Sequence, residues 1–259
     1  MDGEQALVLI DVADRIAVIT MNRPERRNAL NGPHIAALDA AVKRIAADPE
    51  VKVVILTGAA APGKLGGFCA GGDIKDSGGP GMELGVPRHA LDGDLARHDT
   101  HAAMLLHMMP KPSIAMIGGP AVGAGLSLAG ACDLRYASTD AVFSSGFIQN
   151  GLAGDYGGSF FWTQILGTAA ARELYLLSDR IDADRALARG MVHGVVPAAE
   201  LRDHVLAIAR RIAAIPSHVL AHVKDNLNQA EETPDRRRFL FANEAANQMA
   251  SVRNRQPSN

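Results

Sequence analysis

Two short apolar runs, each ending in glycine, constrain the fold of this chain more than any other feature. The first is VVILTG at residues 53–58, and the second is SIAMIGG at residues 113–119. A strand with almost no polar position is typical of a sheet that is covered on both faces. The first run follows residues 33–47, where apolar side chains recur at helical spacing until Asp48-Pro49 ends the pattern. A helix followed by a buried strand indicates a crossover unit, and therefore an α/β fold.

The rest of the chain divides into a mixed part and a helical part. Alternating apolar residues predict strands at 7–12 and 16–21, turned at Ala13-Asp14. After Val196-Pro197 every remaining pattern is helical. We therefore expect a core of residues 1–196 and a helical region of residues 197–259. Further helices are expected at residues 90–109, 123–132, 160–166, 169–177, 201–214, 217–231 and 236–251, and a short strand at 141–145.

Charge and cysteine usage exclude several classes of protein. The chain has 26 Lys and Arg against 28 Asp and Glu, so a broad surface for nucleic acid or for anionic membranes is not expected. The two cysteines, Cys69 and Cys132, have no CxxC spacing and fit a reduced thiol pair better than a disulfide framework. No signal peptide and no apolar run of membrane-spanning length is found. These features favour a cytoplasmic protein.

Both buried runs lead into small residues, FCAGGD after the first and PAVGAGLSLAG after the second. Small residues allow a ligand to approach the main chain closely. A helix that begins near Gly123 would direct unpaired N–H groups and the positive end of its dipole toward such a ligand. Two N–H groups, one from each segment, could together stabilise an oxyanion. The alternative is that both segments are tight turns of an ordinary α/β protein.

Four motifs in one order resemble the crotonase superfamily, the enoyl-CoA hydratases and isomerases, over nearly the whole chain. They are MNRPERRNAL, FCAGGDIK, PAVGAGLSLAGACDLRYAS and LSDRIDADRALARGMVHGVVP. The resemblance implies a crotonase (ClpP-like) spiral of ββα units with a C-terminal helical region that forms trimers. It also implies acyl-CoA thioester substrates, with coenzyme A as part of the substrate and no permanently bound cofactor. The expected assembly is a homotrimer or a dimer of trimers.

The resemblance assigns the oxyanion-binding N–H groups to Ala70 and Ala124, where the family usually has glycine at the second position. It places coenzyme A along residues 23–28 and 70–75. The basic candidates for phosphate contacts are Arg26, Arg27 and Lys75, and each could equally be a solvated charge. Ala70, Asp73 and Ile74 belong to the same loop, in which Asp73 is better suited to brace the turn than to touch substrate.

Two departures from the family remove the hydratase carboxylates. Hydratases of this family activate water with two glutamates, and the matching positions here are Ser127 and Phe147. Neither side chain acts as a general base near neutral pH. A carboxylate is available instead at Asp155, in NGLAGDYGGSFF, which resembles the isomerase-like branch. One carboxylate can move a double bond from 3-enoyl to 2-enoyl, and burial by Phe160–Trp162 would raise its pKa into a useful range. The competing interpretation makes Asp155 the N-cap of the next helix.

Several alternatives stay open at this point. The chain could be a hydratase with an atypical site, an Asp-nucleophile CoA-thioester hydrolase or dehalogenase, or a non-catalytic acyl-CoA-binding paralogue. Tyr156 could donate a hydrogen bond in the pocket or simply be packed. His89 could line the acyl pocket, while His98, His101 and His107 are expected on a solvated helix face. No third ligand accompanies these histidines, so no metal site is expected.

Overall fold

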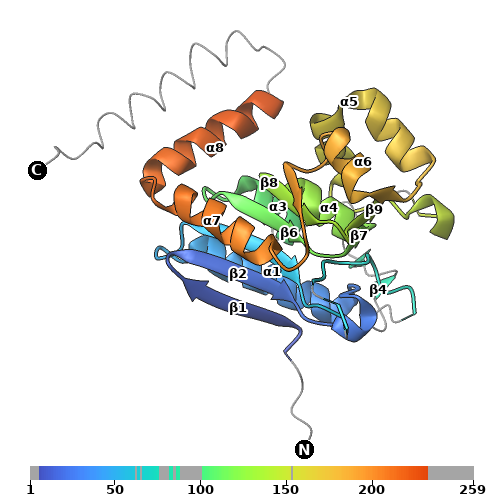
Figure 1. Ribbon diagram of the computed structural model, residues 1–259, viewed down its shortest axis with the longest axis horizontal. Coiled ribbons are helices and arrows are strands. Elements are labelled where there is room, and N and C mark those ends of the chain that lie inside the picture. The colour runs from blue at the N-terminus through green and yellow to red at the C-terminus, as the bar shows by residue number, and fades with distance from the viewer. Residues whose placement is uncertain are drawn as a thin grey trace, which may run out of the picture.

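The computed structural model describes residues 6–61, 63–64, 66–75, 82–83, 86–87, 101–152 and 154–232. A six-stranded sheet in the order β1-β2-β3-β6-β8-β11 organises the fold, which confirms the expected α/β class (Figure 1). β1 is antiparallel to β2, and each further neighbour is parallel. The strands are β1 (Val8–Ala13), β2 (Ile16–Met21), β3 (Val53–Gly58), β6 (Ser113–Ile117), β8 (Leu134–Ser138) and β11 (Gly194–Val196).

A smaller sheet lies beside the main one, in the order β10-β9-β7. Its strands are β7 (Pro120–Val122), β9 (Val142–Ser144) and β10 (Ile181–Asp182), and a separate pair joins β4 (Met82–Glu83) to β5 (Val86–Pro87). The helices are η1 (Pro24–Arg26), α1 (Gly32–Ala47), α3 (Ala102–Met108), α4 (Ala124–Ala131), η3 (Ile148–Asn150), α5 (Gly158–Leu176), α6 (Ala183–Ala188), α7 (Leu201–Ala213) and α8 (Ser217–Glu232).

Alternate side chains of the central strands enter two different hydrophobic layers. Ile19 of β2 and Leu56 of β3 join the main core with α1 and α3, whereas Ile16 and Ile55 face α7. The main sheet is therefore covered on both faces, as its unbroken apolar strands require. Figure 1 shows α7 lying across one face of the sheet, with α1 beyond the other. The helical region that begins after residue 196 thus packs directly on the core through α7.

Most expected elements are present, with informative differences. The β1–β2 hairpin turns at Asp14-Arg15 rather than Ala13-Asp14, because the φ angles of both are positive, 52° and 64°, as a two-residue hairpin of type I′ needs. The two helices expected at 160–166 and 169–177 form α5, which breaks at Gly167 with φ 75° and ψ 165°. β8 was not predicted, because its charged Arg135 interrupts the apolar pattern.

Two expected helices fall wholly or partly outside the described residues. α3 begins at Ala102, so the expected N-terminal part of the helix at 90–109 lies outside them up to residue 100. The helix expected at 236–251 lies outside them entirely.

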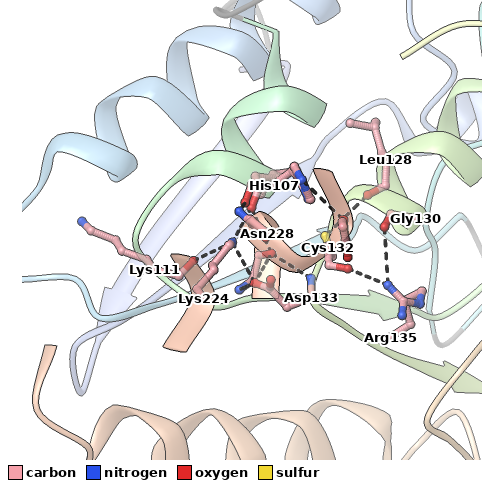
Figure 2. A network of polar contacts seen from close by, with 12 residues as sticks. His107, Lys111, Leu128, Gly130, Cys132, Asp133, Arg135, Lys224 and Asn228 are labelled. Atoms are coloured by element: carbon pink, nitrogen blue, oxygen red, sulfur yellow. Dashed lines mark hydrogen bonds and ion pairs between the residues drawn. The ribbon is translucent and has the colours of Figure 1, made fainter. Parts of the chain in front are cut away.

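α8 is fastened to the core by a buried lysine. Lys224 is 4% exposed, and its Nζ donates to the carbonyls of Leu106 at 2.7 Å and Lys111 at 3.1 Å. The same Nζ pairs with Asp133 Oδ2 at 2.8 Å, which also accepts from Ser113 Oγ. Figure 2 shows Lys224 and Asp133 at the centre of this network. Because a buried ammonium needs partners, the network fixes the position of α8 against α3 and β6.

Candidate active site

The two glycine-rich segments lie side by side, as their shared pattern suggests. Cys69 and Ala121 form a parallel bridge, in which Cys69 N–H donates to Pro120 O and Val122 N–H donates to Cys69 O, both at 3.0 Å. A Cβ on Gly125 would lie 2.1 Å from Cys69 O, so only glycine permits this approach. The chain following β3 and the chain following β6 are thereby joined by backbone hydrogen bonds, and both are largely buried at this point.

Ala124 is the first residue of α4, which is buried along its whole length. The first N–H groups of a helix have no intrahelical acceptor. Among the residues that the structure describes, no other backbone group accepts from Ala124. Gly123, with φ 56°, turns the chain so that α4 begins here. Ala124 therefore offers a free donor at the positive end of a helix dipole.

The second expected donor is already engaged. Ala70 N–H donates to the carbonyl of Arg27 at 3.1 Å. Arg27 has a left-handed φ of 53°, which places it in the sharp turn after η1. An oxyanion bound between Ala70 and Ala124 would have to replace the Arg27 carbonyl as the acceptor of the Ala70 N–H. Hydrogen bonds of catalytic groups often form fully only when the substrate is present.

Three polar residues hold the loop of residues 66–75 in place. Asn28 Nδ2 donates to Phe68 O at 2.8 Å and to Ala59 O at 2.9 Å. Arg23 is 8% exposed and pairs with Asp73 at 3.1 Å. Asp73 is itself 6% exposed and accepts from the Lys75 N–H at 3.2 Å, which is the bracing role expected for it. Sequence reasoning did not assign these roles to Arg23 and Asn28, although both stand in the MNRPERRNAL motif.

The expected phosphate-binding side chains are all exposed. Arg26, Arg27 and Lys75 are exposed, and Ile74 is 58% exposed. Arg23, by contrast, is buried and committed to Asp73. His89, the candidate for the acyl pocket, lies outside the described residues.

Asp155 stands just before α5 with a carboxylate that lacks hydrogen-bond partners at one oxygen. Its Oδ1 is buried and has no partner among the described residues. Burial raises the pKa of Asp155 to about 7, while the positive charge of His101 opposes that shift. The capping interpretation is wrong, because Gly157 is the N-cap of α5 and no side chain caps it. Asp155 is thus a base with a pKa near neutrality, in the direction expected from the sequence.

The aromatic residues expected to bury Asp155 make other contacts. The rings of Phe160 and Phe161 lie 6.1 and 5.2 Å from His107, and Trp162 Nε1 donates to Leu126 O at 3.1 Å. Tyr156 directly follows Asp155, and its buried hydroxyl has no partner among the described residues.

Ser127 and Phe147, the residues expected at the positions of the hydratase glutamates, carry no carboxylate. Ser127 is fully buried, and its Oγ bonds back to Gly123 O at 3.4 Å. Phe147 is 6% exposed and stacks on Tyr175, with ring centres 6.2 Å apart. A Cβ on Gly158 would lie 2.2 Å from Ser127 Oγ and 2.5 Å from the Tyr175 hydroxyl, so these three residues meet. Sequence reasoning missed Tyr175, which comes from the far end of α5.

The prediction of solvated histidines is wrong for two of the three. His107 is 9% exposed, and the side chain of His101 is 17% exposed. His101 Nδ1 lies 3.4 Å from Asp39 Oδ2, which is a pairing across 62 residues that no local pattern reveals. His98 lies outside the described residues. No cluster of metal-binding side chains occurs in the described part of the chain.

Cys69 is close to the carboxylate but is not reactive. Burial raises the pKa of its thiol to about 12, and the charge of Asp155 adds to the effect. A thiol with this pKa is protonated at neutral pH and is a poor nucleophile. This leaves Asp155 as the candidate for proton chemistry in the site.

Comparisons with known proteins identify the family of the chain. The family model described as enoyl-CoA hydratase/isomerase matches residues 11–258. The chain is 33% identical over 228 residues to the 1,2-epoxyphenylacetyl-CoA isomerase of Escherichia coli (strain K12), covering 86% of this chain and 82% of that protein. It is 31% identical over 225 residues to 4-chlorobenzoyl coenzyme A dehalogenase-1 of Arthrobacter sp, covering 86% of this chain and 78% of that protein.

A solved structure matches the fold as well. The crystal structure of a probable enoyl-CoA hydratase/isomerase from Mycobacterium abscessus superposes with a TM-score of 0.80 at 32% identity, covering 94% of this chain and 89% of that chain. The fold and the glycine-rich site thus define a protein of the crotonase superfamily that processes acyl-CoA thioesters. The chain belongs to the enoyl-CoA hydratase/isomerase family.

Proposed function

We propose that this protein moves the double bond of a 3-enoyl-CoA to the 2-position, with Asp155 as the single acid and base. The observation that carries the proposal is the state of Asp155, whose pKa is raised by burial to about 7. A group with this pKa is partly ionised at neutral pH, so it can both accept and return a proton.

The chemistry needs only one side chain. Asp155 takes a proton from the α-carbon of the thioester, and the electron pair forms a dienolate. The same carboxyl group returns the proton to the γ-carbon, which leaves the double bond conjugated with the carbonyl. The enolate oxygen would be held by the free Ala124 N–H and by the Ala70 N–H once it has left Arg27. Each such donor typically contributes about 3 kcal/mol to the transition state.

The absence of the hydratase carboxylates supports isomerisation over hydration. Ser127 and Phe147 occupy those positions and contact Tyr175, whose pKa burial raises. The Ser127 hydroxyl, the Phe147 ring and the Tyr175 phenol, whose pKa is raised, do not act as bases that activate water near neutral pH. The relative named 1,2-epoxyphenylacetyl-CoA isomerase also isomerises the acyl group of a CoA thioester, although that group is an epoxide and not a 3-enoyl chain.

The substrate would lie across the surface made by the two glycine-rich segments. Coenzyme A, as part of the substrate, would run along Arg26 and Arg27, with Lys75 at the end of the loop as a further phosphate contact. Ala70, Asp73 and Ile74 would form the adjoining loop wall. The acyl chain would enter beside Ser127, Phe147 and Tyr156, with His89 as a further expected lining residue.

The assembly and location follow from the family and the cysteines. We expect a homotrimer, alone or paired into hexamers, formed through the helical region of residues 197–259 outside the core of residues 1–196. Cys69 and Cys132 are both free and buried, which supports the expected reducing, cytoplasmic location. No helix in the described residues is long and apolar enough to cross a membrane.

A second reaction is favoured by the open Oδ1 of Asp155 and the dehalogenase relative. A carboxylate oxygen of Asp155 would attack the halogen-bearing carbon of a haloaryl acyl group, and the carbon–halogen bond would break with loss of halide. The resulting aryl ester is then hydrolysed by water, which returns the Asp155 carboxylate and leaves a hydroxyl group on the ring. This route leaves a covalent ester on Asp155, which intact-protein mass spectrometry would detect after rapid quenching. Isomerisation leaves no such adduct, so the two reactions are separable.

The proposal is tested by following a 3-enoyl-CoA in deuterated buffer by NMR, with the native protein and Asp155→Asn in parallel. The expected result is double-bond migration and deuterium incorporation with the native protein only. Asp14→Asn is the matched control, because Asp14 lies in the exposed β1–β2 turn. Accumulation of 3-hydroxyacyl-CoA at the same rate in both proteins would contradict the assignment. Background rates in every variant would instead favour a non-catalytic acyl-CoA-binding protein.

A further inference from the structure

Asp39 and His101, which come from another part of the chain, form a pair whose histidine interacts electrostatically with Asp155, the catalytic candidate. Asp39 of α1 and His101, the residue before α3, place Oδ2 and Nδ1 3.4 Å apart. Asp39 Oδ1 also accepts from the Ala102 N–H at 2.7 Å, which fixes the carboxylate at the start of α3. The side chain of His101 is 17% exposed and that of Asp39 is 22% exposed, so the pair is shielded from most of the solvent.

His101 reaches the site through Tyr156. The two rings meet edge to face, with centres 5.6 Å apart and planes at 68°. Tyr156 has a left-handed φ of 50° and directly follows Asp155. His101 and Asp155 affect each other: protonated His101 lowers the pKa of Asp155, and ionised Asp155 raises the pKa of His101.

We infer that Asp39 holds His101 as an imidazolium beside Asp155, and that His101 is thereby a positioning residue that keeps the Asp155 carboxylate ionised. The role of His101 in the reaction rests on the proposed function, whereas the coupling of its charge to Asp155 does not.

The Asp39–His101 pair offsets the effect of burial on the charge of Asp155. Burial favours the neutral carboxylic acid at position 155, yet proton abstraction needs the carboxylate. A cation nearby restores part of the charged form without entering the reaction. Asp39 stabilises this cation, because its 3.4 Å contact with His101 is the largest influence on the histidine pKa and raises it against the opposing effect of burial.

The other titratable groups around the pair do not supply such a charge. Among the described groups, His101, Cys69, Tyr156 and Tyr175 interact electrostatically with Asp155. Asp39 and Asp155 interact electrostatically with His101, whose ring also contacts Tyr156. Burial raises the pKa of the thiol and of both phenols, so all three are neutral at neutral pH. Within the described residues, His101 is therefore the cation of the site.

The first test is the pH profile of the reaction. His101→Gln removes the cation, so the pKa of Asp155 rises and the acid limb of kcat moves up by roughly one pH unit. Well above that limb, kcat returns to within about twofold of the native value, because Asp155 is then ionised without help. A loss of equal size at every pH would show that His101 is only structural and would overturn the inference. His204→Gln, on the exposed face of α7, is the matched control.

The second test reads the coupling without any turnover. Titration of the histidine ring signals by NMR, with His101 assigned from its absence in His101→Gln, gives the pKa of His101. Asp39→Asn and Asp155→Asn should each lower that pKa, and Asp14→Asn should not. The drop caused by Asp155→Asn should match the shift of the acid limb in His101→Gln, because coupling between two sites is reciprocal.

The two proposals fail separately. If the native protein does not isomerise 3-enoyl-CoA but Asp155→Asn lowers the pKa of His101, the proposed function is wrong and the coupling stands. If isomerisation requires Asp155 but the pKa of His101 is the same in native protein and Asp155→Asn, the coupling is wrong and the function stands.

Discussion

At the scale of single residues, Asp155 occupies a place that disfavours its own charge. Its pKa in the folded protein is about 7, against about 3.9 for an unperturbed aspartate. The folded state therefore binds more protons than the unfolded state between these values, and stability falls as pH rises from about 4 to about 7. Such a cost is typical of a group kept for catalysis rather than for folding.

Asp155→Asn should therefore stabilise the protein while it abolishes isomerisation. At pH 8 the variant should exceed the native free energy of unfolding by an amount on the order of 2 kcal/mol, and the difference should shrink at pH 5. Urea denaturation at both pH values measures the effect. A difference that is the same at pH 5 and pH 8 would show that the native carboxylate is not desolvated.

Gly158 offers a second prediction at this scale. In Gly158→Ala the new methyl group would lie 2.2 Å from Ser127 Oγ and 2.5 Å from the Tyr175 hydroxyl, so these side chains or the start of α5 must shift. We expect a loss of about 1–3 kcal/mol in stability and a lower kcat. Ser127→Ala should recover part of both losses in the double variant, because it removes the nearest atom. Strictly additive effects in the double-mutant cycle would contradict the contact.

At the scale of elements, local pattern and long-range contact differ in what they reveal. The helices α1, α7 and α8 were predicted within two residues of their bounds, because each has a regular apolar stripe. Two short strands were missed: Arg135 interrupts the apolar pattern of β8, and β11, at the edge of the sheet, is only partly buried. α5 was expected as two helices, and Gly167 shows why that pattern was interrupted.

The attachment of α8 is testable through Lys224. Lys224→Met removes the buried ammonium and leaves the carbonyls of Leu106 and Lys111 without their donor. We expect the free energy of unfolding to fall by about 2–3 kcal/mol. The loss should not be larger, because Asp133 keeps its hydrogen bonds from Ser113. Lys43→Met, at an exposed position of α1, is the control. Equal stability of the two variants would argue against an anchoring role for Lys224.

At the scale of the whole molecule, the sequence predicted the fold class and the two glycine-rich segments, but not the pairings across the chain. Asp155 was identified by resemblance and by its glycine setting. The pair of Asp39 with His101 was not, because the two residues lie 62 positions apart and no local pattern connects them. The hydrogen bond from Ala70 to Arg27 was also unforeseen, since no residue pattern encodes the direction of a backbone N–H.

The proposed trimer is tested on α8. Val223 is 52% exposed and Leu227 is 61% exposed, so the helix presents apolar side chains outward. If the helical region joins copies of the chain, Leu227→Glu should shift the protein toward monomers in sedimentation velocity. Leu9→Glu, at a 46% exposed position on β1, is the control and should leave the oligomer intact. A native protein that sediments as a monomer would refute the assembly.

The interlocking of the two glycine-rich segments also predicts where this protein can evolve. Cys69 pairs with Ala121, and Gly125 leaves no room for even a methyl group beside Cys69 O. A library of all single substitutions should therefore show a continuous intolerant tract through both segments, including changes as small as glycine to alanine. Under the proposed function, new acyl-CoA preferences should arise through residues around this tract, because every substrate would place its thioester carbonyl at the same segments. Evolution of this chain should therefore keep the backbone of the two glycine-rich segments and change the side chains around them.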